Sequence, residues 1–406
     1  MKITNTAFLC GYFSVNCPVK GLKEGGWVKR TYTEEDVIKL QNYYFPEFAQ
    51  CMADEITLYS MPIHNACSLD FNGENVPFLI EEIRLWEAPF HIILYAVKLR
   101  FEEVEFNSVT WALNSLRNFV FYHDMHRPFM NAALYPIIEI YNKTMDTHET
   151  FDKDISWLAE SGNKFKIFQI LKTAEPIEQG DEQLLIYDAA TLAAHTPHST
   201  GINSPTYVQH VLDEHYISVF SGWSGIALLD TFTLMTTDTP EWVIANWEKD
   251  YFDKIYIYQL FRKVFLYSVN LHYRRRTEDV LELEKKLSLF EQNHSYPAIS
   301  YNFLPNIINS AIEKSLNTQR DYDQLNRMIN KELDIRRNQA EEKTNHFLTF
   351  LTCLTLFSAI YDAASLFNDS FGYADVFPSD HFGFRFVSTI LLVVVLIIYL
   401  ILNKKK

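Results

Sequence analysis

The sequence predicts an α/β cytoplasmic domain, followed by a long stalk helix and two C-terminal transmembrane helices. Three observations indicate this order. Strand-like segments rich in β-branched and aromatic residues occupy the chain from Glu55 onward. After Asp238 the pattern becomes helical, with apolar residues mostly three or four positions apart. The last part of the chain holds two long runs with almost no charge.

The composition narrows the class of protein. The chain has 406 residues, which is enough for about two domains before the apolar runs. Its formal net charge of −15 leaves no basic stripe to neutralise phosphates, so we expect no nucleic-acid partner. The five cysteines show no paired spacing, which indicates reduced thiols in a cytosolic domain. The N-terminus has no apolar core with a cleavage site, so we expect no signal peptide.

Residues 1–238 form the predicted α/β domain. The first fifty residues show little periodicity, except for a capped helix start at Thr33–Asp36. Three strand-like segments follow, and Asn107–His123 has helical periodicity. The predicted strands then resume at Lys164–Thr173, Gln183–Tyr187 and Ile217–Leu234.

Two helices and a stalk come next. Glu241–Arg276 predicts one long amphipathic helix, and Thr277–Gln292 predicts a second, more charged one. The stalk begins at Pro305, and no Gly or Pro interrupts residues 306–367. A continuous helix over that stretch would be ~90 Å long. We therefore expect the stalk to run directly into the first membrane span.

The two apolar runs predict the membrane spans. Phe347–Phe367 carries a single charge, at Asp362, and Phe386–Leu402 carries none. A bilayer core requires about 20 apolar helical residues, or about 17 at the short limit. A helix on the membrane surface, or a buried helix of a soluble domain, is the alternative for the first run. The predicted segments are a helical pair at 239–304, the stalk at 305–346, transmembrane helices at 347–367 and 384–403, an outer loop at 368–383 and a basic tail at 404–406.

Basic residues give the expected orientation. Arg336, Arg337 and Lys343 precede the first run, a lysine cluster follows the second, and the loop between them has no Lys or Arg. The positive-inside rule then places both termini in the cytoplasm and the loop outside. The expected location is the inner (plasma) membrane, with membrane lipid as a partner.

One face of the first span carries threonine, asparagine and small side chains. Such a face either lines a water-filled path or permits close helix packing. One helix cannot enclose a pore, so a pore requires several copies around an axis. The candidate pore-lining residues are Asn338, Glu341, Asn345, Thr349, Thr352, Thr355, Leu356, Ala359 and Ala363.

Charged residues mark both ends of this predicted path. The outer loop is acidic, which would concentrate cations at an outer mouth. The terminal lysines would form a basic inner ring in a symmetric assembly, or would serve only as a topology anchor that meets anionic lipid. The outer residues are Asp369, Asp375 and Asp380, and the inner ones are Lys404, Lys405 and Lys406.

Catalytic motifs are absent from the sequence. It has no Walker loop, no GxGxxG, no HExxH and no GxSxG. Ser221–Gly225 (SGWSG) is interpreted as a turn before a strand. His123–His126 (HDMH) offers two imidazoles and a carboxylate, but a metal site needs further ligands, and a polar helix end explains the motif as well. We therefore expect no enzyme.

A run of three arginines provides the candidates for ligand binding: Arg274, Arg275 and Arg276. Guanidinium groups hold phosphate through paired hydrogen bonds. Basic residues are also favourable at a helix C-terminus, which explains the run without a ligand.

The layout resembles the CorA family of divalent-cation channels. That family has an α/β head, helices beside a stalk that becomes the first span, a short outer loop, a second span and a basic end. Ile360 and Tyr361 stand where the family's Ile-Tyr precedes its Gly-Met-Asn selectivity motif. The resemblance runs from about Glu55 to the C-terminus. It implies a homopentamer with a central pore for divalent cations such as Mg²⁺.

The selectivity motif departs from the family pattern. Asp362, Ala363 and Ala364 stand in place of Gly-Met-Asn, so the resemblance does not carry magnesium selectivity over. A ring of Asp362 carboxylates would attract cations with less discrimination. In this respect the chain is similar to the CRISPR-associated CorA effectors of type III systems. That similarity implies a nucleotide second messenger as ligand, such as a cyclic oligoadenylate or an S-adenosylmethionine–AMP conjugate.

Three functions remain open from the sequence. The first is an ion channel that opens when a small cytosolic ligand binds its head, as an antiviral effector. The second is a housekeeping transporter of magnesium, cobalt or nickel ions. The third is a membrane-tethered sensor or scaffold without a pore.

Overall fold

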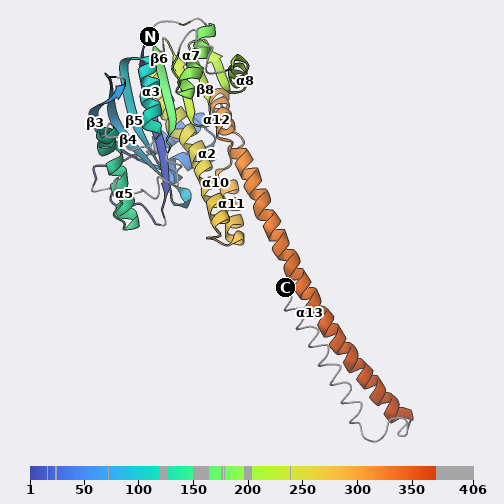
Figure 1. The fold of residues 1–406 in the computed structure, drawn as a ribbon. Helices are drawn as coiled ribbons and strands as arrows, with labels where there is room; N and C mark the ends of the chain where they lie inside the picture. Colours follow the sequence, from blue (N-terminus) through green and yellow to red (C-terminus); the bar gives the residue numbers. More distant parts are fainter. Residues whose placement is uncertain are drawn as a thin grey trace. The chain divides into compact units, whose positions relative to one another are not determined.

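The computed structural model describes residues 1–371 apart from 16, 23–24, 72, 119–125, 150–163, 175–176, 178, 196–203 and 238. Met1–Asn326 form one compact unit, and a second unit begins at Arg327. Figure 1 shows the sheet and helices of the first unit and the long helix α13.

A mixed β-sheet organises the first unit. In the described residues it has nine strands in the order β2-β3-β4-β5-β1-β6-β9-β8-β7. Neighbouring strands are antiparallel except β6 and β9, which run parallel. The predicted α/β character of this region is therefore present. The strands are β1 (Lys2–Ser14), β2 (Val28–Lys29), β3 (Thr57–Phe71), β4 (Glu74–Ala88), β5 (Ile92–Glu105), β6 (Lys166–Thr173), β7 (Tyr216–Phe220), β8 (Trp223–Ala227) and β9 (Thr231–Thr236).

Helices cover the sheet and extend the first unit. The capped helix start predicted at Thr33–Asp36 is confirmed, because the Asp36 N–H donates to Thr33 Oγ1 and the Thr33 N–H donates to the Asp36 carboxylate. The helices are α1 (Glu34–Tyr43), α2 (Pro46–Gln50), η1 (Cys51–Glu55), η2 (Pro89–His91), α3 (Phe106–Arg117), α4 (Arg127–Phe129), η4 (Met130–Leu134), α5 (Tyr135–Met145), α7 (Gln179–Thr191), α8 (Pro205–His215), α9 (Glu241–Asn246), η5 (Trp247–Tyr256), α10 (Ile257–Arg275), α11 (Val280–His294) and α12 (Phe303–Leu316).

Strand β1 lies inside the sheet and is covered on both faces. Ala7 and Leu9 belong to a buried core that includes residues of α3, α5 and α7. Phe8 lies between them and stacks on Phe252 of η5, with a centroid distance of 3.8 Å. Successive side chains of a strand point to opposite faces, so Phe8 faces a second layer formed by η5 and α10. This layer positions the site described below.

Partly buried ion pairs connect that second layer to the sheet. Arg84 on β4 donates through Nη1 to Asp253 of η5 at 2.6 Å. Lys98 on β5 donates to Glu248 of η5 at 2.7 Å. The helix predicted over Glu241–Arg276 is confirmed as the consecutive segments α9, η5 and α10, although its middle third is π-helical.

Two secondary-structure predictions are corrected. The sequence pattern did not reveal β1, because burial on both faces removes the alternation of apolar and polar residues. Gln183–Tyr187 lies in helix α7 rather than in a strand. Acidic residues in the first turn of α7, Asp181 and Glu182, favour a helix start there.

The predicted stalk is interrupted. Helix α12 ends at Leu316, Asn317 has a left-handed conformation (φ 55°, ψ 31°), and α13 (Thr318–Phe371) begins at the next residue. Asparagine adopts this conformation more readily than most residues, because its short side chain bonds locally. The absence of Gly and Pro therefore did not ensure one continuous helix.

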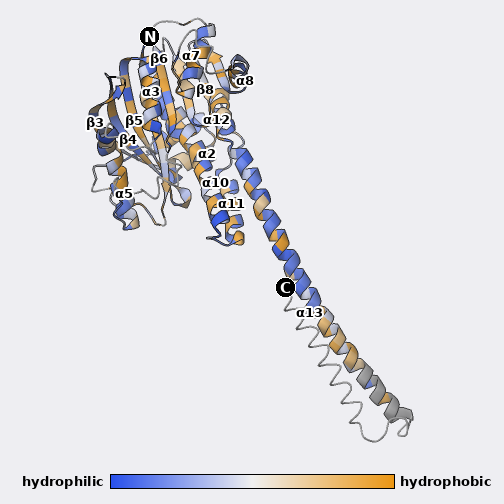
Figure 2. Ribbon diagram, in the orientation of Figure 1, coloured by the Kyte–Doolittle hydropathy of each residue, from blue (hydrophilic) through white to orange (hydrophobic). Residues whose placement is uncertain are grey.

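The predicted membrane spans are corrected. No helix in the described part of the chain combines the length and the apolar character needed to cross a membrane. The run Phe347–Phe367 lies in α13, where threonines and Asp362 interrupt the apolar residues, and the first half of α13 is hydrophilic (Figure 2). Phe386–Leu402 lies outside the described residues. The predictions of a two-span fold, of an ion channel and of an inner-membrane location depended on these spans and are withdrawn with them.

Candidate functional site

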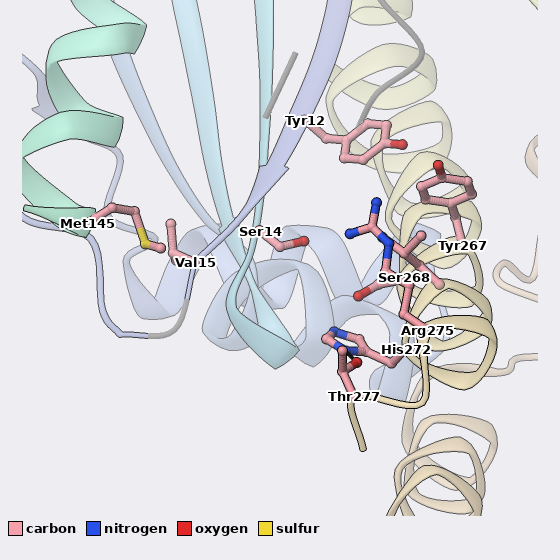
Figure 3. A pocket seen from close by; sticks show the side chains of 10 residues that line it. Tyr12, Ser14, Val15, Met145, Tyr267, Ser268, His272, Arg275 and Thr277 are labelled. Atoms are coloured by element: carbon pink, nitrogen blue, oxygen red, sulfur yellow. Dashed lines mark hydrogen bonds between the residues drawn. The ribbon is translucent and has the colours of Figure 1, made fainter. Parts of the chain in front are cut away.

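A cavity of about 250 Å³ lies between the end of β1 and the C-terminal half of α10. Figure 3 shows the rings of Tyr12 and Tyr267 and the guanidinium of Arg275 pointing into the space between these elements. Both elements belong to the first compact unit. The cavity is lined by Tyr12, Ser14, Val15, Met145, Tyr267, Ser268, Leu271, His272, Arg275 and Thr277.

The local sequence explains why these side chains converge. Tyr12 and Ser14 are an even number of residues from Phe8 on β1, so their side chains point to the same face of the sheet as Phe8, which is the face that α10 covers. Tyr267, Leu271 and Arg275 are spaced four residues apart on α10 and therefore share one face of the helix. The rings of Tyr12 and Tyr267 meet edge to face, with centroids 6.3 Å apart.

Hydrogen bonds fix the part of the cavity wall formed by the C-terminal end of α10. The backbone N–H of Arg276, which is left-handed at φ 51°, donates to the carbonyl of Tyr273 and ends α10. The N–H of Thr277 donates to the carbonyl of His272. The side chains of His272 and Thr277 also bond, with Nδ1 2.7 Å from Oγ1. The chain thus turns back so that Thr277 faces the cavity.

The cavity lining is cationic and aromatic. Among its described residues, Arg275 carries a full positive charge and no Asp or Glu is present. Hydroxyl groups of Ser14, Ser268 and Thr277 add hydrogen-bonding capacity. The carbonyl end of α10 carries partial negative charge, which would repel an anion unless a cation stands beside it. Arg275 supplies that cation.

The structure separates the three candidate arginines. Arg275 lines the cavity. Arg274 donates through Nε to Asn270 Oδ1 at 3.1 Å, on the exposed side of α10. Arg276 is the left-handed cap residue of the helix. Only one of the three predicted ligand-binding residues therefore lies in the cavity wall.

The candidate pore-lining residues lie on α13. Asn338, Glu341, Asn345, Thr349, Thr352, Thr355, Leu356 and Ala359 are exposed. The hydroxyls of Thr349, Thr352 and Thr355 donate to backbone carbonyls of the same helix at 2.8–2.9 Å. Asp362 is exposed as well. The side chains of Ala363, Ala364 and Asp369 lie outside the description, as do Asp375, Asp380, Lys404, Lys405 and Lys406. This placement leaves the predicted roles untested.

Two other sequence motifs have structural roles. His126 bonds through Nε2 to Ser115 Oγ at 2.8 Å and is buried, whereas His123, Asp124 and Met125 lie outside the described residues. Ser221 and Gly222 form the turn that precedes strand β8, as interpreted, whereas Trp223–Gly225 already belong to that strand.

Sequence reasoning missed a group of possible metal ligands. Cys51, Glu55 and His294 offer sulfur, oxygen and nitrogen atoms that lie within 4.8 Å of one another. Cys51 and Glu55 are four residues apart, which is a usable signal on a helix. His294 is 239 positions further along the chain, so no local spacing pointed to it.

The resemblance to the CorA family rests on the layout of the sequence and on Ile360 and Tyr361 alone. Comparison with protein-family models, with curated proteins and with solved structures gives no match for this chain.

Proposed function

We propose that the unit Met1–Asn326 is a sensor module that binds a small anionic ligand of the nucleotide class in the cavity between β1 and α10. The observation that carries the proposal is the convergence of one guanidinium and two tyrosine rings in the cavity wall, without a carboxylate among its described residues. A guanidinium pairs with phosphate oxygens, and aromatic rings stack on a base.

The size of the cavity favours one nucleotide unit. Typical small-molecule sites have volumes of about 300–1,000 Å³. At about 250 Å³ this cavity suits a base with its sugar and nearest phosphate, with further phosphates in solvent. The hydroxyls of Ser14 and Thr277 would then bond to the sugar or the phosphate.

Helix α10 connects the proposed ligand site with the junction of α12 and α13. Lys263 of α10 donates to the carbonyl of Leu316, the last residue of α12, at 2.7 Å. It also pairs with Asp321 in the first turn of α13. A ligand that changes the position of α10 would change the contacts of this junction, which is the behaviour of a sensor.

The experiment is isothermal titration calorimetry on the full chain, with ATP, AMP and adenosine as probes. We expect ATP and AMP to bind and adenosine to bind more weakly, because only the nucleotides present phosphate to Arg275. Charge-assisted hydrogen bonds contribute about 1.5–3 kcal/mol, so Arg275→Gln should weaken ATP binding about 10- to 150-fold.

The matched control is Arg274→Gln. It removes the same charge from the same helical turn but lies outside the cavity wall. We expect an ATP affinity within about twofold of the unchanged chain. If both variants weaken ATP binding equally, the arginines act only through the positive charge that they place at the C-terminal end of α10, and not through a contact of Arg275 with the ligand. Absence of binding by every nucleotide tested would overturn the proposal.

A further inference from the structure

Three side chains with metal-binding atoms meet where η1 approaches the end of α11. Cys51 and Glu55 are the first and last residues of η1, and His294 is the last residue of α11. Cys51 Sγ lies 3.8 Å from His294 Nδ1, and Glu55 Oε2 lies 3.6 Å from the same nitrogen. The three side chains therefore surround one point.

These separations fit the donor spacing around a single tetrahedral ion. With bonds of about 2.3 Å to sulfur and about 2.0–2.2 Å to nitrogen and oxygen, tetrahedral angles place neighbouring donors about 3.4–3.6 Å apart. The separations of Cys51 and Glu55 from His294, 3.8 Å and 3.6 Å, exceed that spacing by a few tenths of an ångström at most, and all three donor atoms lie within 4.8 Å of one another. Small side-chain rotations are enough to close the difference.

Aromatic packing holds His294 in place before any ion binds. Its ring contacts Phe90, Phe261 and Phe290 at centroid distances of 5.8, 5.4 and 5.7 Å. The hydroxyl of Tyr258 donates to the His294 carbonyl at 2.8 Å and so fixes the end of α11 against α10. A ligand held by its surroundings loses little freedom on binding, which favours affinity.

The carboxylate is the exposed member of the group. Cys51 and His294 are buried, whereas the Glu55 side chain is 42% exposed. An ion can therefore reach the sulfur and the imidazole past the carboxylate. Three protein donors leave the fourth position of a tetrahedral ion to a water molecule.

The imidazole of His294 is already in the protonation state that binds a metal ion, whereas the thiol of Cys51 is not. Burial lowers the pKa of His294 to about 4, so the imidazole is neutral near pH 7 and its contact with Glu55 is not an ion pair. Burial, and then the charge of Glu55, raises the pKa of Cys51 to about 12. A bound cation would displace the thiol proton, as metal ions do at cysteine sites.

We propose that Cys51, Glu55 and His294 bind one divalent transition-metal ion of the zinc class. A thiolate and an imidazole select zinc, cobalt and their neighbours over the hard cations magnesium and calcium, which prefer oxygen donors. The charges of the thiolate and the carboxylate balance the charge of the ion. The bound ion would fasten η1 to the end of α11, a connection that joins residues far apart in the sequence.

The test uses cobalt(II) as a spectroscopic probe on the full chain without an affinity tag, after removal of metal with a chelator. We expect one cobalt ion per chain, with the visible bands of a tetrahedral site and a thiolate-to-cobalt charge-transfer band, and displacement of cobalt by zinc. Cys51→Ser should abolish the charge-transfer band. Cys17→Ser should keep it, because Cys17 donates to the carbonyl of Thr144 and lies outside the group.

A second pair of variants keeps the test decisive if Cys51→Ser fails to fold. Glu55 is exposed, so Glu55→Gln should fold and should weaken cobalt binding by at least about 100-fold. Asp54→Asn changes the neighbouring exposed carboxylate and should leave cobalt affinity nearly unchanged. If no thiolate-to-cobalt band forms, or if Glu55→Gln and Asp54→Asn behave alike, the three residues form only a thiol–imidazole hydrogen bond beside a surface carboxylate, and the proposal is wrong.

Discussion

Lys263 Nζ lies 2.5 Å from Asp321 Oδ2, and this ion pair joins helix α10 to the first turn of α13. Asp321 lies only four residues after the left-handed Asn317, where the chain passes from α12 to α13. Because α10 also carries Tyr267 and Arg275 of the cavity wall, it is the element shared by the candidate ligand site and the start of α13. The sensor proposed above depends on that shared helix.

Replacing Lys263 by Gln should loosen the start of α13. The variant loses the ion pair with Asp321 and the bond to the Leu316 carbonyl, so we expect faster hydrogen–deuterium exchange at residues 319–326. The loss of global stability should be only about 0.5–1 kcal/mol, because the pair is partly exposed. Lys314→Gln is the control, since Lys314 donates to the Glu214 carbonyl instead. Equal exchange in both variants would contradict the role given to Lys263.

Replacing Asp253 by Asn should destabilise the first unit strongly. Asp253 is 7% exposed and bonds to Arg84, whose side chain is 11% exposed. The variant removes a charge-assisted hydrogen bond of Arg84, which keeps Glu82 and Glu248 as partners, so we expect a cost of about 1.5–3 kcal/mol. Asp250→Asn removes a carboxylate that is 41% exposed and leaves Lys254 its bond to the Lys249 carbonyl, so it should cost less, about 1 kcal/mol. Urea denaturation of both variants measures the difference, and similar midpoints would show that the Arg84 pair is not important for stability.

Replacing Gly11 by Ala should create a steric clash inside the sheet. A Cβ at Gly11 would lie 2.3 Å from the hydroxyl and Cζ of Tyr95, and Tyr95 is fully buried. We expect a destabilisation of about 1–3 kcal/mol, measured by chemical denaturation. The control is Gly222→Ala, where a Cβ meets nothing within 4 Å. Adding Tyr95→Leu to Gly11→Ala should recover part of the loss, and no recovery would mean that the clash is elsewhere.

Acid should weaken the contact between Asp230 and its two cationic neighbours. Burial alone raises the pKa of Asp230, but the hydrogen bond and charge of Lys166, and then Arg117, outweigh it and lower the pKa below its ordinary value of 3.8. The folded state therefore gains stability above about pH 4, and this gain is lost as pH falls through the lower pKa of the folded protein.

The Asp230→Asn variant tests this titration. It should be less stable than the unchanged chain at pH 7, and the difference should shrink as pH falls toward about 2.5. Thermal unfolding followed by circular dichroism across this range gives the comparison. A difference that stays constant with pH would show that Asp230 does not titrate between the two states.

The local signals in the sequence located several elements well. The Thr33–Asp36 capping box and the three strand-like segments after Glu55 are present in the structure, because each depends on neighbours within a few residues. The long helix after Pro240 does too, apart from its π-helical segment. Such patterns depend only on residues that are close to one another in the sequence.

Features made by distant parts of the chain were not predictable. Strand β1 is buried by helices on both faces, so it lacks the alternation of a surface strand. The break at Asn317 uses a residue that also occurs inside helices. The cavity unites β1 with α10, and the metal-ligand group unites Cys51 with His294. Of the candidate site residues from the sequence, Arg275 alone lies in that cavity.

Photo-crosslinking of the full chain with 8-azidoadenosine triphosphate tests the ligand site most directly. A base that stacks on the ring of Tyr12 or of Tyr267 brings the azide close to both elements of the cavity wall, because the two rings contact each other. We expect labelled peptides from residues 12–15 of β1 and 267–275 of α10, with labelling prevented by excess ATP and reduced by Arg275→Gln. Labelling that ATP prevents but that maps only to other segments would contradict the proposed site.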